Sequence, residues 1–439
     1  MPTQTNNHAA VPSHRASRLM HLGGLAVGMA GGMLAEGARR AWRGELTDAR
    51  SLLLTPDNAA RLADKLSRMR GAAMKVGQLL SMEAGELLPP EFTNVLTRLR
   101  EDAHYMPLGQ VAEQLEAEWG SGWEQRFQRF SFTPLAAASI GQVHEALLKD
   151  GRRLAVKLQY PGVRRSIDSD VDNVATLFRL LPILPNEANL APLFAEAKHQ
   201  LHEEADYRRE ATHLRHFRDL LKHDPDFLLP EIVDEFSSEN VLAMSFVSGS
   251  PVEALANADS TIRDHIVSML IRLLFREFFE FGTVQTDPNF ANYRYDAETN
   301  RIVLLDFGAT RHYAPKRMAQ LRNLMAAAYH QDQAAVVKAA LPLGYLDDVD
   351  PPARRQSIIE LFLLICEPAR HAGAYDFGNS DLTTRLRDSS YAMSYDRGQW
   401  RPPPADLIFL HRKLAGLFLL AARLKARVDV GALLIPHLN

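Results

Sequence analysis

The sequence contains a single cysteine, Cys366, among 439 residues. A lone cysteine excludes an intramolecular disulfide framework and a zinc site built from several cysteines, and it suits a reducing compartment. The chain also lacks a charge imbalance, because 50 Lys and Arg residues accompany 53 Asp and Glu residues. Nucleic-acid-binding domains are usually strongly basic, so we expect no nucleic-acid partner. No Gly-x-x-x-x-Gly-Lys-Ser/Thr motif occurs, which disfavours a P-loop enzyme.

Acidic residues are missing from the first 35 positions, and residues 19–35 form an uncharged run. As a helix, this run would be roughly 26 Å long, slightly short of the ~30 Å hydrocarbon layer of a membrane. Small residues at every fourth position would let two such helices approach closely. These residues are Gly24, Gly28 and Gly32. We therefore predict a membrane-contacting helix with a homodimer face, and the sequence leaves open whether it spans the bilayer or lies on it.

The hydrophobic pattern divides the rest of the chain into a helical, a mixed and a second helical part. Apolar residues recur at threes and fours over 56–99, which indicates helices. The period changes to two over 130–132, 142–148 and 154–159, which predicts a small antiparallel sheet. We expect a long helix over 195–221 and a further strand over 241–246. Helices dominate beyond residue 251, so the fold class is α+β. We expect four segments with these bounds: 1–45, 46–129, 130–247 and 248–439.

The strongest chemical signal is a pair of motifs in the last segment. Asp287-Pro-Asn-Phe-Ala-Asn292 is followed by Leu304-Leu-Asp-Phe-Gly308 at the end of an apolar strand. This spacing is typical of the two loops that manage the magnesium ions of a nucleotide in protein kinases. Magnesium prefers hard oxygen ligands, which Asp306 and the amide of Asn292 offer, whereas Asp287 can orient or deprotonate an acceptor. A second Asp-Phe-Gly, at Asp376, follows no apolar strand, so we interpret it as coincidence.

Lys157 lies on the predicted strand 154–159, where kinases keep a lysine that contacts nucleotide phosphates. The alternative is an ordinary strand-edge lysine, but a small-residue loop upstream favours the phosphate interpretation. This loop, which lies where a kinase has its Gly-rich phosphate cover, is Ala136-Ala-Ala-Ser-Ile-Gly141. Alanine is mostly confined to negative φ, so we expect the loop to be stiffer and to present fewer amides to phosphate than a Gly-rich one.

The acids of the predicted helix 195–221 include Glu204, Asp206 and Glu210. The latter two are four residues apart and would share one helix face. We predict that one acid pairs with Lys157. The same helix carries two histidine pairs, but neither has a third metal-ligand type in the sequence around it.

The motifs together resemble the UbiB family of atypical kinase-like proteins, also called the ADCK type, over residues 19–426. The overall pattern is most similar to the branch required for ubiquinone (coenzyme Q) biosynthesis. The motifs that carry the resemblance are Lys75-Val-Gly-Gln78, Ala136-Ala-Ala-Ser139, Gln159-Tyr-Pro-Gly-Val163, Ser166-Ile-Asp-Ser-Asp170, Glu204-Ala-Asp206, Gln285-Thr-Asp-Pro-Asn289 and Leu305-Asp-Phe-Gly-Ala-Thr310.

The resemblance implies a bilobal kinase-like fold with a helical N-terminal extension, and it assigns roles to individual residues. Lys157 would contact phosphate with Glu210 as its partner, Asn292 and Asp306 would hold magnesium, and Asp287 would take the catalytic-loop position. The nucleotide would also meet Ala136, Ala137, Ala138 and Ser139, the gatekeeper Met244, and an adenine hinge over Ser245 to Val247. In the extension, Lys75 and Gln78 would fold over the active site and face Glu204 and Asp206.

By this resemblance, we expect an ATP- or ADP-binding, Mg²⁺-dependent atypical kinase or ATPase that supports ubiquinone biosynthesis at a membrane. No His-Arg precedes Asp287, and no Ala-Pro-Glu motif lies at activation-segment distance after Asp306, so protein phosphorylation is not expected. Two alternatives stay open: a small-molecule, lipid or protein kinase, and a pseudokinase scaffold that binds nucleotide without turnover.

The resemblance also implies partners and a location. Membrane lipids or quinone precursors and the enzymes of ubiquinone biosynthesis would be the partners. Only 18 residues precede the Gly-rich run, which is short for a mitochondrial transit peptide. We therefore expect the cytoplasmic face of a bacterial inner membrane, with the matrix side of the mitochondrial inner membrane as the alternative.

Overall fold

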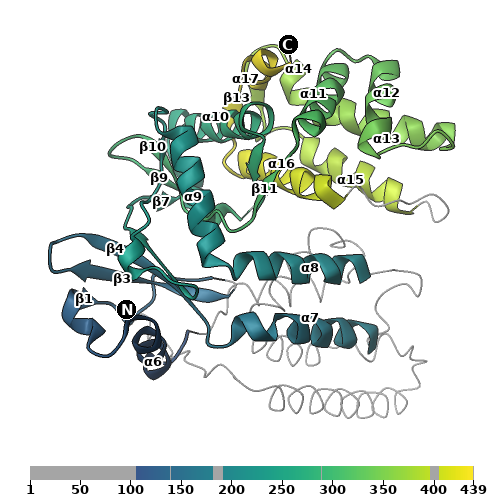
Figure 1. Cartoon of the computed structure of the whole chain (residues 1–439). Coiled ribbons are helices and arrows are strands. Elements are labelled where there is room, and N and C mark those ends of the chain that lie inside the picture. Colours follow the sequence, from purple (N-terminus) through teal and green to yellow (C-terminus); the bar gives the residue numbers. More distant parts are fainter. Residues whose placement is uncertain (1–104, 139, 181–190, 288, 396–404, 439) are drawn as a thin grey trace, which may run out of the picture. The chain divides into compact units, whose positions relative to one another are not determined.

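A computed structural model describes residues 105–138, 140–180, 191–287, 289–395 and 405–438 (Figure 1). The chain forms two compact units. The N-terminal unit comprises the residues up to Thr212 together with Glu231–Phe246, and the C-terminal unit comprises His213–Pro230 and Val247 onward. Each unit is described by itself below.

A five-stranded antiparallel sheet forms the centre of the N-terminal unit, with the strand order β1-β3-β4-β6 and with β2 paired to β3. The small antiparallel sheet predicted from the alternating pattern is therefore present. The elements of this unit are α6 (Leu108–Trp119), a 3₁₀ turn (Trp123–Arg126), β1 (Phe127–Phe130), β2 (Ala136–Ala137), β3 (Gly141–Leu148), β4 (Arg153–Gln159), α7 (Val163–Leu180), α8 (Ala191–Glu204), the first part of α9 (Tyr207–Leu221), a 3₁₀ turn (Asp234–Phe236) and β6 (Val241–Ser245).

The first strand lies earlier than the predicted 130–132. A β-bulge between Phe127 and Arg129 interrupts the alternation of side chains. As a result, Phe127 and Phe130, three residues apart, both pack on the rings of Trp119 and Trp123. The aromatic spacing of this strand is therefore set by the bulge and not by a period of two.

Helix α6 belongs to the core of the N-terminal unit. Its Val111 and Leu115 are fully buried and join the cluster formed by sheet residues such as Val156 and Leu158. Burial of this apolar surface is the main stabilising contribution to such a unit. The predicted boundary between residues 129 and 130 falls within β1, so the core begins well before it.

The continuous helix predicted over 195–221 is wrong, because α8 ends at Glu204 and α9 begins at Tyr207. Gln159 on β4 donates its Nε2 to the carbonyl of Ala205 at 2.8 Å. The amide of Arg209, which would bond that carbonyl in a continuous helix, donates instead to Oδ1 of Asp206 at 3.0 Å. Asp206 therefore acts as the N-terminal cap of α9.

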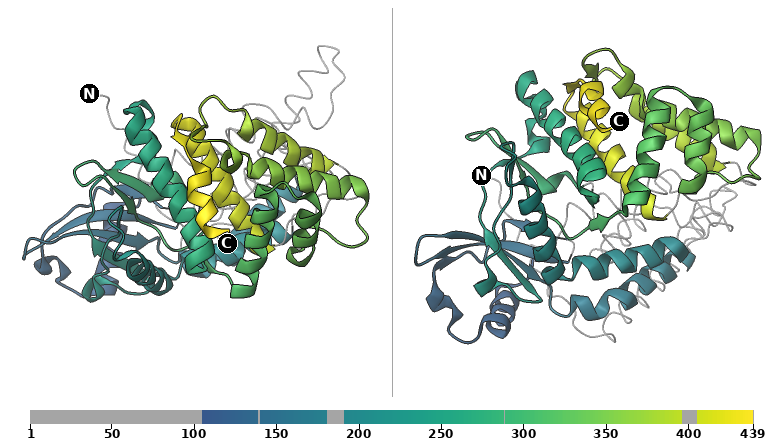
Figure 2. Two further views of the ribbon diagram at one scale, coloured as in Figure 1. Left: turned by 90° about the horizontal axis from the view of Figure 1, so that it is seen from above. Right: turned by 45° about the horizontal axis from the view of Figure 1, so that its top comes forward.

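The C-terminal unit is mostly helical, as the sequence predicts, and carries three small sheets with the orders β5-β10-β9-β7, β8-β11 and β12-β13. Figure 2 shows two further views of these helices. The elements are the last part of α9, β5 (Phe227–Leu228), β7 (Ser250–Pro251), a 3₁₀ turn (Val252–Asn257), α10 (Ser260–Arg276), a π-helical turn (Glu277–Phe281), β8 (Thr283–Gln285), a 3₁₀ turn (Phe290–Asn292), β9 (Tyr293–Asp296), β10 (Arg301–Leu304), β11 (Thr310–His312), α11 (Pro315–Tyr329), α12 (Gln333–Leu343), α13 (Pro352–Ile365), α14 (Glu367–Arg370), β12 (Tyr375–Asp376), α15 (Leu382–Tyr395), α16 (Ala405–Arg423), β13 (Arg427–Val428), α17 (Val430–Leu434) and a final 3₁₀ turn (Ile435–His437).

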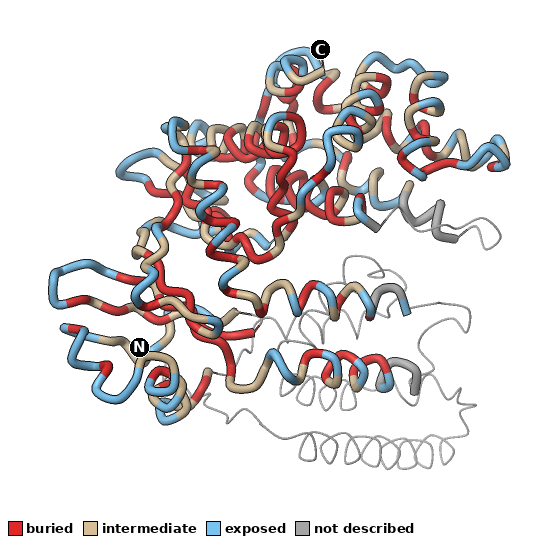
Figure 3. Tube along the Cα trace, viewed as in Figure 1, coloured by how far each residue is buried: buried red, intermediate tan, exposed pale blue. Residues whose placement is uncertain are grey.

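Helix α10 carries a long buried face in the C-terminal unit (Figure 3). Asp259 caps its N-terminus by accepting a hydrogen bond from the amide of Thr261 at 2.8 Å. The helix packs against α16 and α17, and it buries apolar residues such as Ile266 and Leu270. It ends in the π-helical turn, after which Gly282 adopts a φ of 60° and starts the path into β8.

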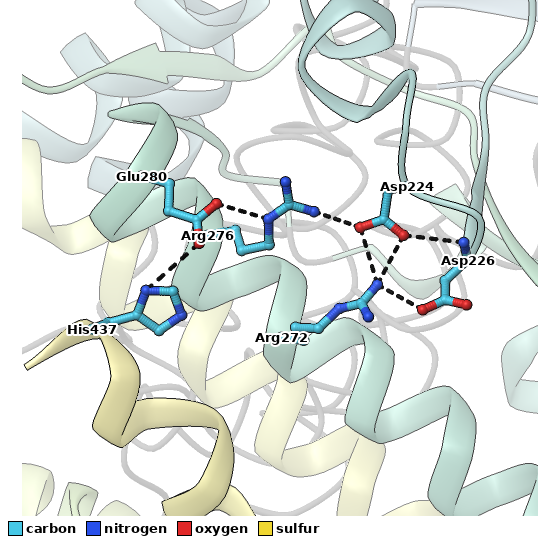
Figure 4. A network of polar contacts seen from close by, with 6 residues as sticks. All are labelled: Asp224, Asp226, Arg272, Arg276, Glu280 and His437. Carbon is cyan, nitrogen blue, oxygen red and sulfur yellow. Dashed lines mark hydrogen bonds and ion pairs between the residues drawn. The ribbon is translucent and has the colours of Figure 1, made fainter.

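A polar network ties the outer side of α10 to two other segments (Figure 4). Arg272 reaches Asp224 at 2.9 Å and Asp226 at 2.7 Å, and Arg276 also contacts Asp224. The network continues through Glu280, which lies 2.8 Å from Arg276 and 3.8 Å from Nδ1 of His437. It therefore joins α10 to the segment before β5 and to the C-terminal turn.

Among the described residues, no helix has the length and apolarity that crossing a membrane requires. The predicted Gly24/Gly28/Gly32 face and the extension with Lys75 and Gln78 lie outside the described residues.

Candidate active site

Lys157 lies on the inner strand β4, between Val143 on β3 and Leu242 on β6. Its Nζ is 2.9 Å from each carboxylate oxygen of Glu210, in the first turn of α9. Both residues are buried, with exposed fractions of 7% for Lys157 and 2% for Glu210. The predicted pairing of Lys157 with one acid of this region is thus present, and the acid is Glu210.

The neighbouring acids occupy different positions. Asp206 caps α9, as described above, and Glu204 is the last residue of α8. The expected partners of these two acids, Lys75 and Gln78, lie outside the described residues. The break between α8 and α9 separates Glu204 from the other two acids, whereas the amide of Glu210 donates to the carbonyl of Asp206 at 3.0 Å, so these two acids stay together at the start of α9.

The alanine-rich loop closes on its own hairpin. Ala136 and Ala137 form β2 and pair with Val143 and Gln142 of β3, and the amide of Ala138 donates to the carbonyl of Gly141 at 2.8 Å. Ser139 lies outside the described residues. The amide of Ala138 is therefore used within the hairpin and is not available to a phosphate.

Gly141 occupies a point of close backbone approach directly after this loop. A Cβ atom at Gly141 would lie 2.2 Å from the carbonyl oxygen of Leu158 on β4. No real Cβ atom tolerates such a distance, and neither strand backbone can move without breaking the ladder. The glycine therefore lets β3 and β4 run close together at the end of the loop. Its register partner on β4 is Gln159, two residues after Lys157.

The segment after β8 places Asp287 against Asn292. The Nδ2 of Asn292 donates to Oδ2 of Asp287 at 2.9 Å, and Asn289 caps the short turn by accepting from the amide of Ala291 at 3.2 Å. The Nδ2 of Asn292 is thus occupied by Asp287. Its side-chain oxygen is the atom that could bind magnesium.

Strand pairing brings Asp306 to the same loop. Tyr293 on β9 pairs with Leu304 on β10, and the amide of Leu305 donates to the carbonyl of Asn292 at 3.1 Å. Asp306 follows directly and accepts the amide of Gly308 through Oδ1 at 3.0 Å. The C-terminal unit therefore presents two hard oxygen donors, which suit Mg²⁺ when phosphate oxygens complete the shell. The described residues contain no group of three or more His, Cys, Asp or Glu side chains that would bind a metal alone.

The second Asp-Phe-Gly motif has a local role only. Asp376 accepts the amide of Gly378 at 3.0 Å, in the same way as Asp306 accepts that of Gly308. Its other oxygen accepts from Asn379 at 2.9 Å, and these bonds lower the pKa of Asp376 below its usual value. The motif thus forms the end of β12 and the turn that follows it, with Phe377 buried and Gly378 exposed, and the bonds of Asp376 serve this turn.

The expected hinge follows β6. Met244 is buried and pairs with Ala155 on β4. The amide of Ser245 donates to the carbonyl of Glu231 at 2.8 Å, and the amide of Phe246 donates to that of Arg153 at 2.9 Å. Both of these amides are thus used within the N-terminal unit, and the chain returns to the C-terminal unit at Val247.

The sequence analysis missed the groups that lie behind the Asp287–Asn292 loop. Gln285 accepts a hydrogen bond from the hydroxyl of Tyr293 at 3.2 Å, and a buried ion pair joins Glu277 to Lys413 nearby. The sequence carries little signal for the pair, because Glu277 directly follows Arg276 and Lys413 directly follows Arg412, so neither is an isolated charge in an apolar stretch. Their partnership was not predictable, since 136 positions separate them.

Known proteins resemble this chain over most of its length. Residues 98–340 match a family model described as the ABC1 atypical kinase-like domain. The chain is 39% identical over 420 residues to the Rattus norvegicus protein named atypical kinase COQ8B, mitochondrial, a match that covers 95% of this chain and 79% of that protein. It is 36% identical over 431 residues to atypical kinase COQ8, mitochondrial, of Saccharomyces cerevisiae, covering 98% of this chain and 86% of the yeast protein.

A solved structure has a similar fold. Rv3197 of Mycobacterium tuberculosis, determined in complex with erythromycin, matches with a TM-score of 0.61 and 26% sequence identity. The match covers 87% of this chain and 96% of that chain.

Proposed function

This chain belongs to the ABC1 atypical kinase-like family, also called UbiB, and on that premise we propose that it binds ATP or ADP with Mg²⁺ and supports ubiquinone biosynthesis at a membrane. The family match and the solved neighbour confirm the predicted α+β kinase-like fold and the atypical-kinase class of enzyme.

The Lys157–Glu210 pair is the observation that carries the nucleotide part of this proposal. A lysine buried in the sheet is costly unless a carboxylate neutralises it, and Glu210 does so from the start of α9. In this role Lys157 binds the α- and β-phosphates while Glu210 holds it in place. Met244 is the gatekeeper, and the carbonyl of Ser245 with the backbone of Val247 meets the adenine.

The C-terminal unit supplies the metal and acceptor side of the proposed chemistry. Asn292 and Asp306 hold Mg²⁺, which neutralises charge on the phosphate oxygens. Asp287 orients the attacking water or acceptor and receives its proton. The pairing within the Ala136–Ala138 segment removes the amide of Ala138 from the phosphate cover, which favours slow ATP hydrolysis over efficient phosphate transfer.

The pathway and the location rest on the relatives. Both atypical kinases reported above carry "mitochondrial" in their names, so the matrix side of the mitochondrial inner membrane joins the bacterial inner membrane as a proposed site. Lipids or quinone precursors and biosynthetic enzymes are the proposed partners, with a homodimer through Gly24, Gly28 and Gly32.

Nucleotide binding is tested by thermal unfolding of the full chain with MgADP. Ligand at ~100 times its dissociation constant should add about 2.7 kcal/mol to the free energy of unfolding, a melting shift of a few degrees. Asp306→Asn should remove most of this shift. The matched control is Asp376→Asn, which changes the same tripeptide motif at the end of β12 and should keep the full shift. Equal shifts in wild type and Asp306→Asn would overturn the magnesium assignment.

The pathway assignment is tested by complementation of a strain that lacks the gene. Wild type should restore ubiquinone, whereas Asp306→Asn should leave a quinone precursor accumulated because Mg²⁺ is not held. Full rescue by Asp306→Asn would favour the pseudokinase alternative. Phosphate transfer from ATP to an isolated acceptor by the wild type would instead favour the kinase alternative.

A further inference from the structure

An ion pair is buried in the C-terminal unit behind the Asp287–Asn292 loop. Glu277, the first residue of the π-helical turn, contacts Nζ of Lys413 on α16. The exposed fractions are 1% for Glu277 and 6% for Lys413. Burial raises the pKa of Glu277 and lowers the pKa of Lys413, and in each case the attraction of the partner opposes the effect of burial.

The surroundings of the pair are apolar. Lys413 lines a small enclosed cavity with Tyr293 and Phe290, the latter within the Asp287–Asn292 loop. Leucines of α10 and α16 complete its wall: Leu270, Leu273, Leu417 and Leu420. Replacing a buried ion pair by apolar residues is often neutral or even stabilising, so stability alone gives little reason for charges here.

Two hydrogen bonds connect the pair to both ends of the Asp287–Asn292 loop. The amide of Gln285, two residues before Asp287, lies 3.4 Å from Oε1 of Glu277. The side-chain oxygen of Gln285 accepts from the hydroxyl of Tyr293 at 3.2 Å, and Tyr293 directly follows Asn292. A tyrosine hydroxyl is protonated at neutral pH, so it serves as the donor in this hydrogen bond.

The backbone around Glu277 departs from regular helix at the same place. The turn Glu277–Phe281 is π-helical, and such widened turns are common at functional sites. It carries Glu277 at its start and leads through Gly282 into β8, whose last residue is Gln285. Glu277 is therefore linked to Gln285 both along the chain and by the hydrogen bond.

We propose that Glu277 and Lys413 are positioning residues, which hold the Asp287–Asn292 loop through Gln285 and Tyr293. Lys413 fixes the carboxylate of Glu277, Glu277 holds the amide of Gln285, and Gln285 holds Tyr293 at the other end of the loop. The effect of these two residues on turnover rests on the proposed function. Their effect on the order of the Asp287–Asn292 loop does not depend on it.

The test uses the double variant Glu277→Gln/Lys413→Met in the full chain. This variant removes both charges, so neither partner stays buried without a counter-charge, and it is expected to fold even where the single variants do not. If the pair contributes only to stability, the folded double variant should hydrolyse MgATP with the kcat of the wild type. A positioning role predicts that kcat for MgATP hydrolysis falls about tenfold to a hundredfold, as for other residues that orient metal ligands. The dissociation constant for ADP measured without Mg²⁺ should not change.

Hydrogen exchange supplies a readout that needs no turnover. Amides of residues 283–295 should exchange faster in the double variant, while those of α10 keep their protection. Tyr293→Phe removes only the hydroxyl that bonds Gln285, and it should accelerate exchange in the same segment and lower kcat. The matched control is Glu253→Gln/Arg423→Met, because Arg423 lies on α16 but forms an exposed pair.

The outcomes separate this proposal from the proposed function. One outcome is that amides of 283–295 exchange faster in the double variant while the wild type neither binds MgADP nor hydrolyses ATP. This outcome would support the positioning role and contradict the nucleotide assignment. Wild-type exchange in both the double variant and Tyr293→Phe would overturn the positioning role, whatever the activity. A fall in kcat of the same size in the Glu253→Gln/Arg423→Met control would also overturn it.

Discussion

Replacing Lys157 with methionine should lower the free energy of unfolding by roughly 3 to 5 kcal/mol, because Glu210 would keep a buried carboxylate without its cation. The Nζ of Lys157 also lies 5.2 Å from the centre of the Tyr207 ring, so the substitution removes a cation–π contact as well. Urea unfolding measures the loss. Glu210→Gln, which strands the lysine instead, should cost a similar amount.

The double variant Lys157→Met/Glu210→Gln distinguishes charge pairing from phosphate binding. Neither charge remains unpaired in it, so much of the unfolding free energy should return. Stabilisation by MgADP should not return, since the phosphate-binding ammonium is still absent. Recovery of both properties in the double variant would contradict the proposed role of Lys157.

An exposed pair on the same hairpin is the matched control. Arg153 and Glu145 contact each other across β3 and β4 at 2.9 Å, but the arginine side chain is 51% exposed. Exposed ion pairs contribute about 1 kcal/mol or less, so Arg153→Met should leave both stability and the MgADP shift nearly unchanged. A loss as large as that of Lys157→Met would mean that any charge removed from this sheet destabilises it.

Acidification from pH 7 to pH 4 should lower the free energy of unfolding by about 3 kcal/mol through His411 alone. His411 is half-buried on α16 and stacks on Tyr345, whose hydroxyl lies 2.6 Å from its Nε2. Burial lowers the pKa of His411 to about 4. The unfolded chain takes up a proton near pH 6.5 whereas the folded chain stays neutral until about pH 4, so stability is full above pH 6.5 and falls between these values.

Two variants check the cause of this loss. His411→Gln should flatten the stability profile between pH 6.5 and pH 4, measured by urea unfolding at several pH values. Tyr345→Phe removes the hydrogen bond but leaves the burial of the histidine unchanged, so it should keep most of the slope. An identical slope in wild type and His411→Gln would show that other groups account for the acid sensitivity.

The sequence predicted the chemistry-bearing motifs because each is short and local. Asp287, Asn292 and Asp306 are recognisable from spacing alone, and the pairing of β9 with β10 then brings them together. The break before α9 was also readable in part, since Asp206 is a favoured N-cap residue. The missing half of that signal is Gln159, which reaches Ala205 from a distant strand.

Contacts distant in sequence account for the features that were not predicted. The pair of Glu277 and Lys413 joins the π-helical turn to α16, and no periodicity marks its members as partners. The bulge in β1 likewise depends on how Phe127 and Phe130 meet the tryptophan rings. A hydrophobic pattern predicts which residues are buried, but it does not predict which buried residues contact one another.

The chain passes between its two units three times, after Thr212, Pro230 and Phe246. Strand β6 therefore completes the sheet of the N-terminal unit only after an excursion of 18 residues, His213–Pro230, into the other unit. A single recombination event at residue 212 between two relatives would pair β4 of one parent with β6 of the other. Exchange of either complete unit between two relatives therefore requires three coordinated crossovers, one at each of these junctions.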